Sequence, residues 1–196
     1  MEIPYTIDRR TDTGLYNAQL GMWLFIASEV MLFGALFSGY ALLRTGADAW
    51  PVGSRHLSVV LGSINTFVLI ASSIVIGLAV RSLRRGQWRR GRRELAITCV
   101  LGLVFLAIKA YEYREHMLAR ELPSTDNFFA VYYTLTGLHA LHVIGGLIVL
   151  AYLVGPGASM WRRQPVRFVH RAAGVSIYWQ FVDLVWILVF VTVYLL

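Results

Sequence analysis

The sequence predicts an all-α integral membrane bundle of five transmembrane helices, forming a single domain over residues 1–196. Two observations predict this fold class. The chain is 57% hydrophobic with a mean hydropathy of +0.60, which is too apolar for a soluble domain. Apolar stretches long enough to cross a bilayer also recur five times along it, and they take up most of its length.

We expect the five helices at about residues 15–43, 57–83, 94–116, 128–154 and 175–196. The first stretch is too long for the core of a signal peptide and lacks the usual small-residue cleavage site, so it is expected to be a retained helix. Pro51, Pro123 and Pro165 mark the first, third and fourth loops. Cys99 is the only cysteine, which excludes an internal disulfide or thiolate metal site.

The net charge of +7 is distributed as an orientation signal. If the N-terminus is on one side of the membrane, that side carries thirteen arginines and the other side four. The thirteen are Arg9, Arg10, Arg81, Arg84, Arg85, Arg89, Arg90, Arg92, Arg93, Arg162, Arg163, Arg167 and Arg171, and the four are Arg44, Arg55, Arg114 and Arg120. Positive charge concentrates in cytoplasmic loops, so the N-terminus is predicted to be cytoplasmic and the C-terminus outside. The basic 81–93 loop is expected to lie against anionic headgroups rather than to bind nucleic acid.

Ionisable side chains inside the spans are the best candidates for functional residues, because they are costly at membrane depth. At 1.5 Å per residue, Glu29 lies about 13 Å and Asp183 about 12 Å from the cytoplasmic side, with His139 and His142 at about 10–14 Å. These four side chains therefore share one layer. Each is either an interhelical hydrogen-bonding group or part of a proton path. Glu29 has no Lys or Arg at its depth and is expected to be neutral, able to donate or relay a proton.

A second polar layer is expected towards the outer face. Lys109 and Glu112 are three residues apart on one helix face, at about 22–27 Å from the cytoplasmic side. Asn65 comes about 12 Å in from the outside on the second helix. We interpret Asn65 as an interhelical hydrogen-bonding group, and Lys109–Glu112 as an interfacial ion pair rather than a relay.

The sequence predicts no metal or haem site and no catalytic centre within the chain. His139 and His142 are spaced as possible ligands, but His56, His116 and His170 all lie near loops and so cannot join them. Metal and haem sites in helix bundles draw their ligands from several helices at one depth. Nucleotide-binding glycine motifs, a nucleophile elbow and paired cysteines are also absent from the sequence.

On these residues the chain resembles subunit III of the haem–copper terminal oxidases, in its short five-helix bacterial form. The segments that carry the resemblance follow in order, one set to each helix: Gly21–Glu29, then Ile64–Thr66 with Ala71–Ser73, then Ala110–Tyr113, Thr136–Val143 and Tyr178–Trp186. Gln180 stands where the family usually has histidine, so a proton role of that imidazole does not carry over. Longer members have two further N-terminal helices, so the lipids held beside that pair do not carry over either.

The resemblance implies a non-redox subunit of a proton-pumping cytochrome c oxidase in the bacterial inner membrane. It implies packing against subunit I, with subunit II and other small subunits in the complex. Haem and copper would belong to those partners, and structural phospholipid to the membrane around them. The implied role is to stabilise subunit I and support proton uptake. The alternatives are a quinol oxidase subunit III, a nitric oxide reductase accessory protein of the same family, and, in a different class, a stand-alone proton-coupled transporter using Glu29 and Asp183.

Overall fold

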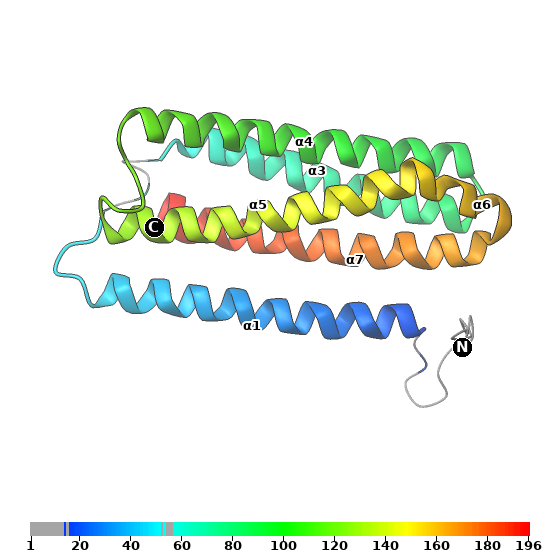
Figure 1. Cartoon of the computed structure of the whole chain (residues 1–196), viewed down its shortest axis with the longest axis horizontal. Helices are drawn as coiled ribbons and strands as arrows, with labels where there is room; N and C mark the ends of the chain where they lie inside the picture. The colour runs from blue at the N-terminus through cyan, green and yellow to red at the C-terminus, as the bar shows by residue number, and fades with distance from the viewer. Residues whose placement is uncertain (1–13, 15, 52, 54–56) are drawn as a thin grey trace.

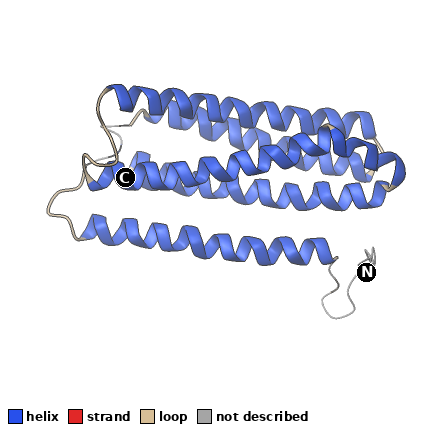
Figure 2. Ribbon diagram, in the orientation of Figure 1, coloured by secondary structure: helices blue, strands red, loops and turns tan. Residues whose placement is uncertain are grey.

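Five long helices run back and forth along one axis in the computed structural model, which describes residues 14, 16–51, 53 and 57–196 (Figure 1). They are α1 (Asn17–Thr45), α3 (Val59–Arg84), α4 (Trp88–Leu118), α5 (Asn127–Val154) and α7 (Pro165–Val189). Short η1 (Pro156–Ala158) and α6 (Ser159–Arg163) join α5 to α7, and the π-helical η2 (Phe190–Leu195) continues α7. No strand occurs among the described residues (Figure 2).

All five long helices are long and apolar enough to cross a membrane, which confirms the predicted fold class. Which end is cytoplasmic stays a prediction. Among the residues on which that prediction depends, Arg9, Arg10 and Arg55 lie outside the described residues, as does His56.

Two helices begin earlier than the apolar pattern indicated. α4 begins at Trp88 rather than near residue 94, and α7 begins at Pro165 rather than near residue 175. Both extra segments are rich in arginine, so hydropathy located the membrane-spanning part and missed the polar turns before it. Pro165 occupies the first turn of α7, where its fixed φ favours a helix and its missing N–H costs nothing.

The bundle is built on an α3–α4 hairpin, with α7 packed between α3 and α5. Two glycines allow the large Trp179 ring into the centre. A Cβ added at Gly102 or Gly146 would lie 2.8 Å from that ring, so only glycine fits at either position. Trp179 and Trp186 are both fully buried and form the middle of the core.

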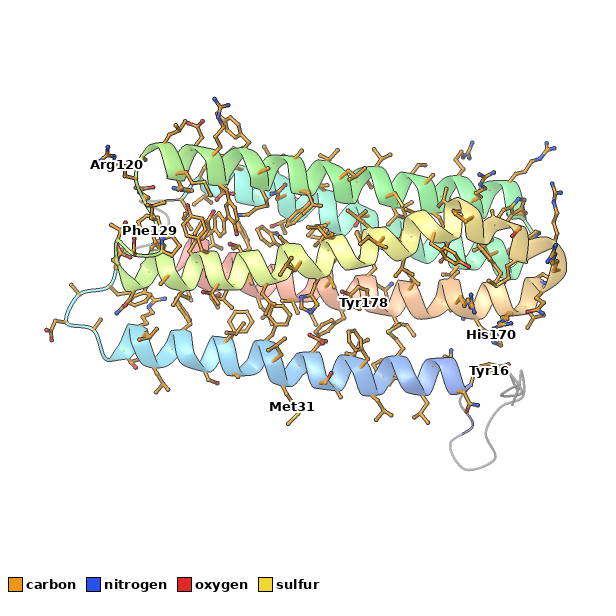
Figure 3. All side chains as sticks on the ribbon, in the orientation of Figure 1. Tyr16, Met31, Arg120, Phe129, His170 and Tyr178 are labelled. Carbon is orange, nitrogen blue, oxygen red and sulfur yellow. The ribbon has the colours of Figure 1, made fainter. Side chains whose placement is uncertain are left out.

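Helix α1 lies at the edge of the bundle, along α5 and α7 (Figure 1). Only 11% of the apolar 18-residue stretch in α1 is buried, whereas 50% of the corresponding stretch in the final span is buried. Trp23, Met31 and Leu42 are exposed, and Met31 points away from the other helices (Figure 3). The outer face of α1 is therefore apolar and uncovered in the isolated chain.

Candidate functional site

Glu29 and His142 meet where α1 faces α5. Glu29 Oε2 lies 2.8 Å from His142 Nε2, and each side chain is 13% exposed. The depth calculation placed both groups in one layer, and the structure brings them into contact. The other ring nitrogen, Nδ1 of His142, lies 2.8 Å from the Leu138 carbonyl oxygen one turn earlier on α5.

These two contacts fix how many protons the pair holds. A carbonyl oxygen only accepts hydrogen bonds, so Nδ1 of His142 must carry a hydrogen. If His142 is neutral, Nε2 is an acceptor and the Glu29 carboxyl must donate to it. If Glu29 is ionised, Nε2 must carry a second hydrogen and the ring is an imidazolium. In both forms one transferable proton sits between the two side chains.

Aromatic rings hold this pair in position. The Phe33 ring lies 5.2 Å from the His142 ring, centroid to centroid. The Tyr178 hydroxyl of α7 donates to the His142 carbonyl oxygen at 2.9 Å, and the Tyr178 ring packs on Phe25 of α1. These contacts tie α1, α5 and α7 together at the level of Glu29. Just before α1 begins, Tyr16 faces His170, with ring centroids 4.1 Å apart (Figure 3).

Asp183 belongs to a separate cluster on another face of α7. Its Oδ2 accepts hydrogen bonds from Ser72 and Ser73 of α3. Phe181, two residues earlier, packs instead on Phe33 of α1, with ring centroids 6.5 Å apart. Asp183 and the Glu29–His142 pair therefore lie at similar heights but on different sides of α7.

His139 is also separate from the pair. Its ring is fully buried, with centroids 5.5 Å from that of Phe105 and 5.2 Å from that of Trp186. Neither ring nitrogen has a hydrogen-bond partner among the described residues. The four groups of the predicted layer thus form one pair and two isolated sites rather than one connected path.

The outer layer contains the most complete polar network. Lys109 Nζ donates to Glu112 Oε2 at 3.0 Å, to the Tyr132 hydroxyl at 3.1 Å and to the Tyr194 hydroxyl at 2.7 Å. Both hydroxyls in turn donate to Glu112 Oε1, at 3.1 and 2.6 Å. All three ammonium hydrogens are therefore used. Lys109 and Glu112 are only 3% and 2% exposed, so the pair lies inside the bundle rather than at its interface with water.

Asn65 differs from its prediction. It is fully buried, but neither amide atom has a hydrogen-bond partner within the described part of the chain. The expected interhelical hydrogen bond is made instead by the next residue, because Trp186 Nε1 donates to Thr66 Oγ1 at 3.0 Å.

Sequence reasoning missed the neutral partners of these charged groups. Tyr132 and Tyr194 complete the Lys109 network, and Ser72 and Ser73 hold Asp183. Tyrosines and serines are ordinary in apolar spans, so their identity alone gave no signal. Ser72 also faces α7 in the structure, where Trp179 Nε1 donates to its hydroxyl at 2.9 Å.

The two histidines of α5 have separate surroundings. Both nitrogens of His142 are engaged, by Leu138 and Glu29, and His139 lies between aromatic rings. Across residues 14, 16–51, 53 and 57–196, no group of three or more His, Cys, Asp or Glu side chains is arranged to hold a metal ion. That the chain itself binds neither haem nor copper stays a prediction.

Comparison with known proteins gives one consistent family. Residues 9–196 match the sequence model of cytochrome c oxidase subunit III. Cytochrome c oxidase subunit 3 of Synechocystis is 36% identical over 90% of this chain and 74% of its own length. The cytochrome bo(3) ubiquinol oxidase subunit 3 of Pseudomonas aeruginosa is 32% identical over 100% of this chain and 92% of its own length. The chain therefore belongs to the cytochrome c oxidase subunit III family, whose members are non-catalytic membrane subunits of haem–copper oxidase complexes.

Proposed function

We propose that this chain packs against subunit I of a proton-pumping cytochrome c oxidase, stabilises it during turnover and supports its proton uptake. Family membership and the five candidate spans make the chain a multi-pass protein of the bacterial inner membrane. Haem and copper, in this proposal, are held by partner subunits, and phospholipid fills part of the contact with them.

The Glu29–His142 pair carries the proton part of the proposal. It holds one transferable proton between two side chains of different helices, and each is only 13% exposed. Burial keeps water from competing for that proton. Such a pair suits a proton buffer for a neighbouring enzyme, because either partner can carry the proton without a charge being left unpaired.

A fused relative supports the choice of subunit I as the partner. A protein of Aeropyrum pernix named haem–copper oxidase subunit I+III is 35% identical over 89% of this chain and 22% of its own length. Joining the two subunits in one polypeptide is compatible only with their lying close together. The uncovered apolar face of α1, which includes Trp23 and Met31, is one surface available for such a contact.

We propose cytochrome c as the electron donor of the complex, and quinol is the alternative donor. The relatives include subunits of both kinds of oxidase at 32–36% identity. We favour cytochrome c because the Ser28–Glu29 pair resembles the cytochrome c oxidase form of the family. A nitric oxide reductase accessory protein is a third possible function within the same family. The stand-alone transporter has no support, because the chain belongs to this family.

Purification and one substitution test the proposal. Chain isolated in mild detergent is expected to carry haem absorbance from its partners, and its isolation without haem would contradict the proposal. Glu29→Gln preserves the hydrogen bond, because the amide N–H donates to His142 Nε2, but it removes the transferable proton. Assembly should persist while proton uptake slows.

The matched variant Asp183→Asn changes the other carboxyl of the predicted layer, which lies on the α3 side of α7. It should assemble and leave proton uptake closer to wild type than Glu29→Gln does. If the two polar sites mainly join helices, Glu29→Ala and Asp183→Ala, which remove the hydrogen bonds, should weaken assembly by about 0.6 kcal/mol or more for each interhelical hydrogen bond lost.

A further inference from the structure

A basic cleft lies between α6 and the beginning of α4. Figure 1 shows these two segments at the same end of the bundle. Its volume is about 600 Å³, within the size range of ligand sites. The lining residues are Trp88, Arg89, Arg92, Ala158, Ser159, Trp161 and Arg162. Three arginines thus surround one cavity whose described lining contains no Asp or Glu.

The beginning of α4 is an electrostatically unfavourable place for these charges. The N-terminus of a helix is the positive end of its dipole, where acidic residues are stabilising and basic residues are not. α4 has no acidic residue in its first turn and instead begins Trp88-Arg89-Arg90. An anion in the cleft would offset both the helix dipole and the mutual repulsion of the arginines.

Existing contacts leave the cleft arginines available to an anion. Arg90 outside the cleft is paired with Glu94 at 3.0 Å, which uses the nearest carboxylate. Arg92 donates through Nε to the Val154 carbonyl oxygen at 3.0 Å, which anchors its guanidinium beside the end of α5. Arg89 and Arg162 are exposed and form no ion pair with any described residue.

The aromatic wall of the cleft is rigid. Trp88 and Trp161 stack with ring centroids 5.2 Å apart and an interplanar angle of 17°. Phe168 packs edge-on against both, with its ring centroid 5.3 Å from that of Trp88 and 5.9 Å from that of Trp161. This cluster joins α4, α6 and α7 and fixes the spacing between Arg89 and Arg162. The cleft is therefore held open by packing in the isolated chain.

We propose that this cleft is a binding site for a phosphate group, held by Arg89, Arg92 and Arg162. Guanidinium groups bind phosphate through paired N–H donors in a geometry that lysine does not provide, and every cation here is arginine. The Ser159 hydroxyl also lines the cleft, where it donates to the Pro156 carbonyl oxygen at 3.1 Å. The phosphate belongs either to the headgroup of an anionic phospholipid or to free inorganic phosphate.

The test uses the full chain, purified with whatever partners it retains and placed in nanodiscs. One arm uses zwitterionic lipid with added phosphatidylglycerol, and the other uses zwitterionic lipid alone with inorganic phosphate in the buffer. Native mass spectrometry counts the bound molecules in each arm. The cleft variant is Arg89→Gln with Arg162→Gln. The matched control is Arg93→Gln with Arg163→Gln, which removes two charges from the same two helices outside the cleft.

Wild type and control are expected to bind one phosphate-bearing molecule at least tenfold more tightly than the cleft variant. Binding in the first arm alone identifies the lipid headgroup, and binding in the second identifies free phosphate. Ala158→Phe narrows the cleft but keeps every arginine, and it should also abolish binding. This variant replaces the double variant in the test if the double variant fails to fold. Equal binding by the cleft and control variants in both arms, or undiminished binding by Ala158→Phe, would overturn the proposal.

Discussion

Removing the charge of Lys109 should strongly destabilise the bundle. Lys109 Nζ lies 3.0 Å from Glu112 Oε2, and the two side chains are 4% and 2% exposed. The other basic side chain near this carboxylate, His116, lies further away, with Nε2 4.0 Å from Glu112 Oε1. Breaking a buried pair by removing one partner typically costs about 3–5 kcal/mol, because the other charge stays buried without compensation. Lys109→Met keeps the length and apolar stem of the side chain, so packing changes little and the electrostatic cost dominates.

Several contacts add to that cost. The ammonium also lies 5.0 Å from the Tyr113 ring centroid and 5.5 Å from that of Trp186, at distances where cations are attracted to aromatic faces. Its hydrogen bonds to Tyr132 and Tyr194 connect α4 to α5 and to the C-terminal η2. We therefore expect a loss in the upper half of the 3–5 kcal/mol range, with η2 released first.

Equilibrium unfolding of the full chain in mixed micelles, by titration with a denaturing detergent, measures this loss. Glu112→Gln is the second variant, and the double variant Lys109→Met with Glu112→Gln closes the cycle. Because the double variant has no buried charge, its loss should be smaller than the sum of the two single losses by about 2 kcal/mol or more. The glutamine carbonyl still accepts from the two tyrosine hydroxyls, so their hydrogen bonds survive.

A pair with one exposed partner on the same helix is the comparison. Arg90 and Glu94 are also 3.0 Å apart, but Arg90 is 58% exposed whereas Glu94 is 10% exposed. Arg90→Met should therefore cost less than Lys109→Met, because the arginine is already largely solvated and contributes less to the pair. If Lys109→Met costs no more than Arg90→Met, or if the two single losses add without coupling, the reasoning about a buried ion pair is refuted.

Three further predictions follow from packing, proton content and ligand sets. Gly146→Ala should destabilise the chain by about 1–3 kcal/mol, because the added Cβ would lie 2.8 Å from the Trp179 ring. In the control Gly34→Ala the added Cβ meets nothing within 4 Å, so thermal unfolding should show no loss of stability. A hydrophobic carbodiimide should modify Glu29 through the form in which its carboxyl carries the shared proton, and peptide mapping that finds only Glu112 or Asp183 modified would contradict this. Metal analysis of the purified chain should find no stoichiometric iron or copper, and finding either would overturn the ligand-set argument.

Hydropathy and depth predicted the elements and the common level of two groups that meet in the site. Apolar length located all five spans, and counting residues along α1 and α5 placed Glu29 and His142 at one level. Depth works because the rise per residue of a helix is fixed. It leaves rotation about the helix axis undetermined, and rotation decides which groups at one level touch.

The two histidines of α5 illustrate that limit. His139 and His142 are three residues apart, which places them about 60° apart around the helix. That difference is enough to direct one ring towards Phe105 and Trp186 in the core and the other towards Glu29 on α1. In a soluble bundle, polar residues mark the outer face and fix the rotation. Spans that are apolar on every side give no such mark.

Hydrogen-bonding partners that are distant in the sequence could not be predicted either. Tyr194 reaches Lys109 across 85 residues, because η2 continues α7 back towards α4. The sequence around Tyr194 does not show whether this tyrosine completes an ion-pair network or lies at a membrane interface. Asn65 shows the converse error, since its polarity indicated a hydrogen bond that Thr66 makes instead.

Turnover of the oxidase with and without this chain tests the central claim most directly. If the chain supports an enzyme whose chemistry lies in its partners, removing it should leave the haem spectrum of the remaining complex intact and preserve the initial rate of oxygen consumption. Activity should then decay faster over successive turnovers, with slower proton uptake at higher pH, and adding back wild-type chain should restore both better than adding back Glu29→Gln. Immediate loss of haem or copper when the chain is removed would contradict the account, because it would place this subunit in the catalytic centre itself.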